Sequence, residues 1–598
     1  MMSVINGVIN QAGTLQRTGD TYRDHQIEFL DGFLGGFDGK IYTLSQAIDN
    51  AENMSSDERQ DALGVLGGGI LALSNESIGG DYERLPERIQ RTVEGLEAYP
   101  AAPRPHGREE SVQDRFGRWS DDAYELNLIL DSAPNPGGTP LVGGKTFSAN
   151  LTTSIGDIAG RLKDDEISVV EHTDGDDSDD TLQQLLGVSS RNHEANHMVL
   201  TGSTGTDGEY GSDALGTYDH PELNQKETEE ALADLFSYEW PDDGEAAAGL
   251  IDWIPEAADS DNPDERRLAG HSALGLVENT TSDDAYNTIL GESGAIADNP
   301  KVAQEFGRVF GSYALDFGQA SPNAGEFNFQ TEDIPEDYAS GREEALEIPG
   351  YNRALFMELI ASDEVGAVNM YRDIQLTRTE LMDSFLEGEI SAEEAASAHG
   401  RLNGLFDSSV HNSELVLQNA DHSRDISEVK IKKIGTQAAV DATVGNIPYA
   451  GGAASTTTKS YTDYLWDGTV DTPSTSSITN KDGLNDKGQE YVTLDNNLYT
   501  IMHLQQKGID VEVDDSLLVD PENDPRFRPY ADQYSSTSRD NARGATWSSL
   551  ESVGYEDEMR NYESEYTNSY NSVAINDTTQ RYDDSREILN RTGLKPAE

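Results

Sequence analysis

The sequence of 598 residues contains no cysteine, which excludes disulfide bonds, thiolate metal sites and a cysteine nucleophile. It also lacks any stretch of about 18 consecutive apolar residues, so no transmembrane helix is expected. Residues 1–20 have neither a cationic start nor a sustained apolar segment, and a cleaved secretory signal is therefore not predicted. Export, if it occurs, would use a route that does not need such a signal.

Basic residues are scarce. Lysine and arginine total 42 against 111 aspartates and glutamates, and the formal net charge is −69 at pH 7. Because no basic stripe is available to neutralise phosphates, binding to nucleic acid is not expected. Like charges at this density destabilise a compact chain unless salt screens them or cations lie among them. The composition indicates adaptation to high salt or to the cell exterior, with weak binding of calcium or other cations on the acidic surface.

Added salt is expected to stabilise the fold, because screening weakens the repulsion among these charges. The midpoint of thermal unfolding, followed by circular dichroism, should be higher in molar sodium chloride than in dilute buffer. A midpoint that stays constant or falls as salt is added would show that self-repulsion does not limit the stability of this protein.

The sequence pattern is mainly helical. Apolar residues recur at spacings of three and four in the segments 26–48, 56–73, 225–254, 302–317 and 355–417. The run Gly67, Gly68 and Gly69 interrupts the second segment and indicates a tight break or a close contact between helices. Short strands are expected only at 491–494 and 511–513.

We therefore expect a mainly α protein built as a multi-helix array, compatible with a solenoid-like stack of helix pairs. Shifts in composition divide it into an N-terminal helical domain (1–100), a middle helical array (115–465), a Ser/Thr/Asp/Gly-rich linker (466–490) and a partly extended C-terminal region (491–598). Within that last region, a polar, tyrosine-rich stretch predicts a surface helix or a segment ordered by a partner.

Trp240 and Trp253 flank a helix pair that is broken by Pro241. Large aromatic side chains dominate the burial of apolar surface in protein cores. Both tryptophans are therefore expected to anchor the core of the middle array.

One short motif is compatible with catalysis. Residues 193–197 match H-E-x-x-H, in which two histidines one helical turn apart bind zinc and the glutamate acts as general base. However, the preceding residues 189–192 are polar, whereas a buried active-site helix requires apolar ones. We favour a structural helix start, with no catalytic residue, no bound metal and no cofactor. The alternative is a zinc-dependent peptidase with the ligands His193, His197 and Glu230 and the base Glu194.

A second motif, Gly143-Gly144-Lys145-Thr146, is similar to the end of a phosphate-binding loop. The first glycine of that motif would fall at Thr139, and no apolar strand precedes it. A turn between two helices explains these glycines better than a nucleotide site does.

Several segments resemble a large, mostly uncharacterised actinobacterial family that has a TPR-repeat region and accompanies type VII secretion or polymorphic-toxin loci. The resembling segments are 63–79, 82–89, 191–202, 235–254, 446–452 and 464–466. The resemblance implies a helical scaffold that carries or accompanies an effector, and it implies no catalytic residues. It also favours a structural role for the segment around His193.

The sequence thus predicts a non-enzymatic scaffold or effector-associated protein of a bacterial secretion or competition system. It would act with protein partners and be secreted or held at the cell surface. Besides the peptidase, two alternatives stay open: a structural protein of a virus or particle, and a cytoplasmic location.

Overall fold

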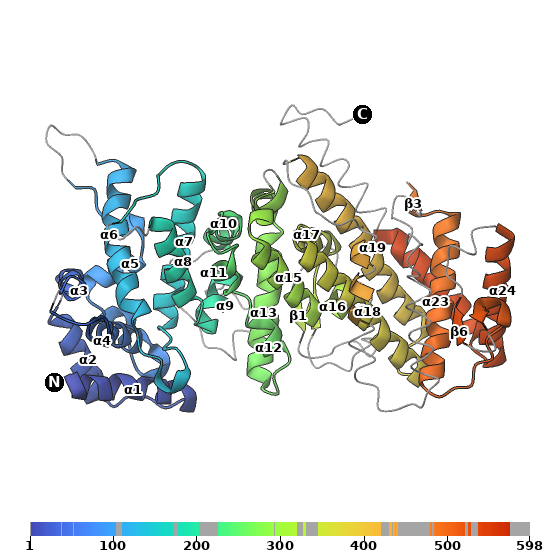
Figure 1. The fold of residues 1–598 in the computed structure, drawn as a ribbon, viewed down its shortest axis with the longest axis horizontal. Helices are drawn as coiled ribbons and strands as arrows, with labels where there is room; N and C mark the ends of the chain where they lie inside the picture. The colour runs from blue at the N-terminus through green and yellow to red at the C-terminus, as the bar shows by residue number, and fades with distance from the viewer. Residues whose placement is uncertain are drawn as a thin grey trace. The chain divides into compact units, whose positions relative to one another are not determined.

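The computed structural model describes residues 2–37, 39–51, 53–102, 110–172, 177–202, 225–291, 294–319, 327–330, 345–419, 430–432, 434–436, 438–439, 479–480, 483–520, 524–527 and 536–573. The chain forms two compact units, Met1–Glu305 (unit 1) and Phe306–Glu598 (unit 2). Helices dominate both (Figure 1), which confirms the predicted mainly α fold.

Unit 1 contains fourteen helices before the segment that leads into unit 2, counted over the part of the chain that is described. Their bounds are α1 (Met2–Thr18), α2 (Asp24–Gly35), α3 (Ile41–Asp49), α4 (Ser56–Ser74), α5 (Glu87–Val93), α6 (Val112–Asp131), α7 (Lys145–Lys163), α8 (Ser178–Ser189), α9 (His193–Thr201), α10 (Gln225–Ser237), α11 (Glu245–Ala248), α12 (Ile254–Ala258), α13 (Pro263–Thr280) and α14 (Asp283–Tyr286). Short turns connect them: η1 (Glu76–Ile78), η2 (Tyr82–Arg84), η3 (Leu96–Ala98), η5 (Pro136–Gly138), the π-helical η6 (Asn287–Gly291) and η7 (Ala295–Asp298). Helix α15 (Pro300–Ser312) crosses the boundary between the units.

Unit 2 is also helical in its described part, with three small antiparallel strand pairs. Its helices are α16 (Ala314–Gly318), α17 (Gly350–Ala361), α18 (Glu364–Glu387), α19 (Ala392–Asn419), α23 (Asp486–Gln506), η8 (Asp515–Leu517), α24 (Ser536–Ser552) and a helix over 556–573. The strand pairs are β1 (Asn328–Gln330) with β2 (Ala345–Glu347), β3 (Thr479–Asn480) with β4 (Gly483–Leu484), and β5 (Leu518–Asp520) with β6 (Asp524–Phe527). No helix in the described ranges is long and apolar enough to cross a membrane.

Helix α4 shows how local sequence and close packing combine. The Ser55 hydroxyl accepts the backbone N–H of Glu58, and the Glu58 carboxylate accepts the N–H of Ser55, so a capping box starts the helix. The helix then runs without interruption through Gly67–Gly69, so the predicted break is wrong. The predicted close contact is confirmed: a Cβ on Gly67 would lie 2.2 Å from the carbonyl oxygen of Ile129 on α6.

Replacing Gly67 by alanine should destabilise unit 1 by about 1–3 kcal/mol, because the added methyl must push α4 away from α6. Gly117→Ala in α6 is the matched control, since a Cβ there meets nothing within 4 Å. That variant should gain up to about 1 kcal/mol from better helix propensity. Urea unfolding followed by circular dichroism measures both, and equal stabilities of the two variants would contradict the prediction.

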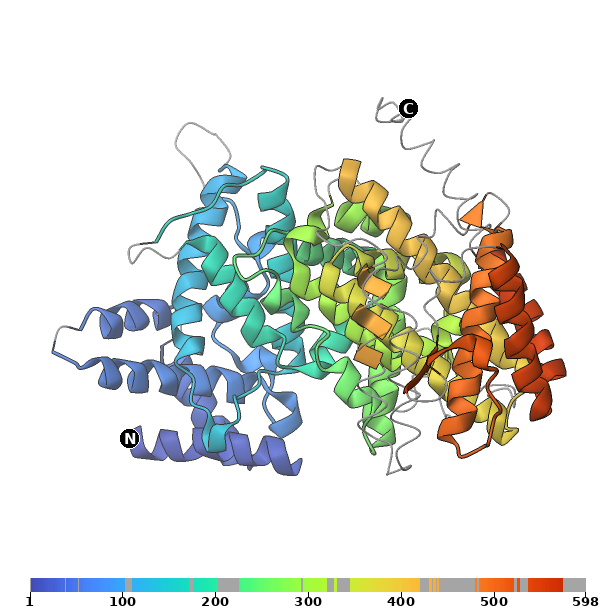
Figure 2. The ribbon, with the colours of Figure 1, turned by 45° about the vertical axis from the view of Figure 1, so that its right-hand side comes forward.

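The C-terminal helices are built into the core of unit 2. In the helix over 556–573, the buried residues Met559, Tyr562, Tyr566 and Tyr570 belong to a hydrophobic cluster that also contains residues of α18, α19 and α23. Figure 2 shows the ribbon of these C-terminal helices in orange and red. Tyr570 donates its hydroxyl hydrogen to Asp407 at 2.6 Å, and Tyr562 lies 2.9 Å from His399 Nδ1. The prediction of a tyrosine-rich surface helix is therefore wrong for the side of this helix that carries these buried tyrosines. The strand predicted at 491–494 is also wrong, because it lies inside α23.

The predicted middle array at 115–465 has residues in both units. Of the predicted linker at 466–490, residues 466–478 lie outside the described ranges, and α23 already begins at Asp486. The bounds at 100, 115, 465 and 490 stay a prediction, which limited proteolysis would test.

Candidate ligand pocket in unit 1

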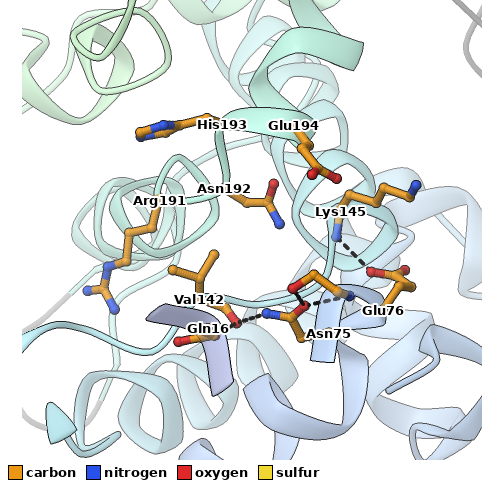
Figure 3. Close-up of a pocket in the computed structure, with 10 residues that line it drawn as sticks. Gln16, Asn75, Glu76, Val142, Lys145, Arg191, Asn192, His193 and Glu194 are labelled. Carbon is orange, nitrogen blue, oxygen red and sulfur yellow. Dashed lines mark hydrogen bonds between the residues drawn. The ribbon is translucent and has the colours of Figure 1, made fainter. Parts of the chain in front are cut away.

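Four segments that are distant in sequence meet around one polar pocket of about 420 Å³ in unit 1 (Figure 3). The first is the end of α1, the second follows α4, the third leads into α7 and the fourth joins α8 to α9. The lining residues are Gln16, Asn75, Glu76, Ser77, Val142, Lys145, Arg191, Asn192, His193 and Glu194.

Hydrogen bonds hold one wall of the pocket in place. The carbonyl oxygen of Val142 accepts a side-chain N–H from Asn75 and another from Gln16, each at 3.0 Å. Asn192 donates to the carbonyl of Gly143 at 2.8 Å and accepts the N–H of Ala195 at 2.9 Å, which caps α9. Because these amides already have protein partners, the wall is ordered before any ligand arrives.

Glycine is required where α7 begins. A Cβ on Gly144 would lie 1.9 Å from the carbonyl oxygen of Ser74, and the Gly144 N–H donates to the Ser74 hydroxyl at 3.1 Å. The Glu76 carboxylate accepts the backbone N–H of Lys145 at 2.9 Å and so occupies the first turn of the helix. The glycines of the segment 143–146 therefore serve close packing, in agreement with the turn that we favoured over a phosphate loop.

Charges of both signs face the pocket. Burial lowers the pKa of Lys145, while the nearby Glu194 and Glu76 raise it. Burial also lowers the pKa of Arg191, and Asp131 opposes that shift. The formal charges of the lining residues thus balance, with two carboxylates and two cationic side chains.

The H-E-x-x-H segment lies at the start of α9, as the favoured interpretation expected. The ring of His193 stacks on Trp253 with centroids 4.8 Å apart and an interplanar angle of 11°. Burial lowers the pKa of His193. Glu194 is exposed in the first turn of the helix and lines the pocket. Neither side chain is committed to a metal by this arrangement.

His197 points into the core instead of into the pocket. Its Nδ1 lies 2.9 Å from the Ser272 hydroxyl, which itself donates to the carbonyl of Leu268 at 2.8 Å. The hydroxyl oxygen must therefore accept, so Nδ1 carries the ring proton. The ring meets His271 edge-on at a centroid distance of 6.4 Å. Burial lowers the pKa of His197 to about 3 and that of His271 to about 4, so both rings are neutral at pH 7.

The structure does not gather the ligands of the alternative zinc site. Glu230 lies on α10, where it is exposed and forms an ion pair with Lys226. Within the described ranges, no group of three or more histidine, aspartate or glutamate side chains is placed to hold a metal ion.

We expect the purified chain to hold no stoichiometric zinc, and Glu194→Gln to leave its stability and metal content unchanged. Elemental analysis after dialysis against a chelator measures the metal. One tightly held zinc per chain, together with a peptidase activity that Glu194→Gln abolishes, would instead support the peptidase.

Sequence reasoning did not single out most of the pocket. Gln16, Asn75, Glu76 and Arg191 carry no motif, and their common location is decided by the packing of α1, α4, α7 and α9. One signal was present: the resembling segments 63–79 and 191–202 supply seven of the ten lining residues.

Residues 10–253 match the family model described as a TPR repeat domain. This range contains every residue that lines the pocket. Stacked TPR units form helical scaffolds whose surfaces bind other proteins. Comparison with the curated proteins and with the solved structures finds no match.

Proposed function

We propose that this chain is a non-enzymatic scaffold that binds protein partners in a bacterial secretion or competition system. The observation that carries the proposal is the match of residues 10–253 to a TPR repeat domain. Scaffolds of this kind act by presenting a surface to other proteins.

The packing of unit 1 supports a scaffold. Helices that are close in sequence lie against one another: α4 on α6, α6 and α7 on α8, and α7 and α10 on α9. Such neighbour-to-neighbour packing leaves the outer faces of successive helices available to a partner. An enzyme is not proposed, because His197 is bound to Ser272 in the core and Glu230 is paired with Lys226.

The charge of −69 supports action in salty surroundings, at the cell surface or in the medium. The same charge would raise the rate of association with a basic partner and slow association with an acidic one. The partner is therefore expected to present a mixed or basic surface.

The test uses the full chain and the products of the genes beside its own. If one of these genes encodes a secretion ATPase, the chain should stay inside cells in which that gene is deleted. At least one purified neighbouring product should bind the chain in isothermal titration calorimetry. The proposal fails if export is unchanged by the deletion and none of the neighbouring products binds, or if the chain is recovered as a component of assembled particles.

A further inference from the structure

We propose that the pocket of unit 1 holds an extended segment of the protein partner, in which an acidic side chain pairs with Arg191 and a basic side chain pairs with Glu194. This inference rests on the proposed function, since it assigns the chemistry of the partner segment that the scaffold binds.

Arg191 lacks a partner in the described part of the chain. Its side chain is half-buried, yet it makes neither a hydrogen bond nor an ion pair there, and Asp131 influences it only at longer range. A guanidinium carries five N–H donors, and leaving them unpaired in a partly buried site is unfavourable. A carboxylate satisfies two of these donors at once and fits their planar geometry.

Glu194 carries the opposite charge and is exposed. Its carboxylate also makes no hydrogen bond or ion pair within the described ranges, although Lys145 is near enough to feel its charge. Figure 3 shows the side chains of Arg191 and Glu194 on opposite sides of Asn192, pointing away from each other. The two opposite charges therefore do not satisfy one another, and each is available to a group of the ligand.

The pocket also presents an amide acceptor. Gln16 donates its amide hydrogen to Val142, and its side-chain carbonyl oxygen receives no hydrogen bond within the described part of the chain. The amides of Asn75 and Asn192 are already satisfied. An N–H of a polypeptide backbone is the matching donor for Gln16. Because this wall is held by the protein, little ordering is needed when a segment binds.

The balance of charge explains why the ligand needs both signs. A simple anion would meet the carboxylates of Glu76 and Glu194, and a simple cation would meet Lys145 and Arg191. The net charge of −69 would in addition repel a purely acidic segment. A segment that carries one acidic and one basic side chain avoids both penalties.

The test uses short synthetic peptides in a Gly/Ser background, labelled with a fluorophore, that carry one Asp and one Lys at varied spacing and in both orders. Peptides with Asp alone, with Lys alone and with neither serve as comparisons. Anisotropy with the full chain should show that one spacing and one order bind best. Peptides that lack either charge should bind roughly tenfold more weakly, the effect of losing one charged hydrogen-bonded pair.

Two variants assign this binding to the pocket. Arg191→Gln and Glu194→Gln should each weaken the best peptide roughly tenfold. The matched control removes the surface ion pair of α5 through Arg91→Gln and Glu87→Gln, and should leave the affinity unchanged. The exchange variant Arg191→Glu with Glu194→Arg keeps the net charge and should reverse the preferred order of Asp and Lys. Thermal unfolding of every variant verifies that unit 1 is folded.

The inference is overturned if two-charge peptides bind no better than neutral ones, or if both pocket variants retain full affinity. It is also overturned if free lysine and glutamate displace the peptide as effectively as unlabelled peptide does, since the ligand would then be a free amino acid. A neighbouring gene product that binds both pocket variants unchanged would reject the pocket and leave the scaffold intact. If the peptides bind as expected but deletion of the secretion ATPase gene leaves export of the chain unchanged, the secretion role alone is rejected.

Discussion

Lowering the pH from about 7.5 to about 5 should destabilise unit 1 by about 4 kcal/mol through His197 and His271. The folded pKa of His197 is lowered to about 3, first by burial and then by the charge of His271. That of His271 is lowered to about 4 by burial and by Arg267. Both rings have an ordinary pKa of 6.5 when the chain is unfolded.

The sign follows from proton binding. Between the folded and the unfolded pKa values, the unfolded chain binds more protons than the folded chain does. The stabilising contribution of the neutral rings is therefore complete above pH 6.5 and is lost as the pH falls toward 3 to 4. At about pH 5 each ring has lost roughly 2 kcal/mol, which is 1.36 kcal/mol for each unit below 6.5.

Urea unfolding of the wild type and of the double variant His197→Gln, His271→Gln measures this contribution. Both chains carry the same carboxylates, so the difference in their acid sensitivity isolates the two rings. The lower pH is kept above the isoelectric point of about 4.2, where the chain would precipitate. Equal losses of stability in the two chains would show that the rings do not titrate in a buried site.

Trp253→Ala should cost unit 1 about 3–5 kcal/mol, a large part of the stability of an ordinary domain. The side chain is 5% exposed, donates its indole N–H to the carbonyl of Leu250 at 3.0 Å and stacks on His193. The sequence-based prediction that Trp240 and Trp253 anchor the core is confirmed, since Trp240 is 2% exposed.

Trp253→Phe provides the matched control for this substitution. Phenylalanine keeps an aromatic ring against His193 but lacks the second ring of the indole and its N–H donor. Trp253→Phe should therefore retain more than half of the stability that Trp253→Ala loses. The transition that belongs to unit 1 is followed in urea by far-ultraviolet circular dichroism. A loss below 1 kcal/mol for Trp253→Ala, well short of the range for buried large-to-small changes, would mean that the ring is not part of the core.

The sequence predicted much less of the candidate site than of the fold. The motif at residues 193–197 was visible in the sequence, and its interpretation as a structural helix start agrees with the stacking of His193 and the core position of His197. The pocket beside it was not visible. Residues such as Gln16 and Arg191 are ordinary polar side chains until four segments bring them together.

The sequence by itself determined the mainly α class and the burial of Trp240 and Trp253. Both follow from the spacing of apolar residues and from side-chain size, which act over a few residues. At Gly67 the sequence left a helix break or a close helix contact open, and the packing of α4 on α6 decided for the contact. Only the tertiary structure decided that residues 491–494 are helical and that Tyr562 and Tyr566 are buried. Contacts with residues more than a hundred positions away stabilise both features, and such contacts override local propensity.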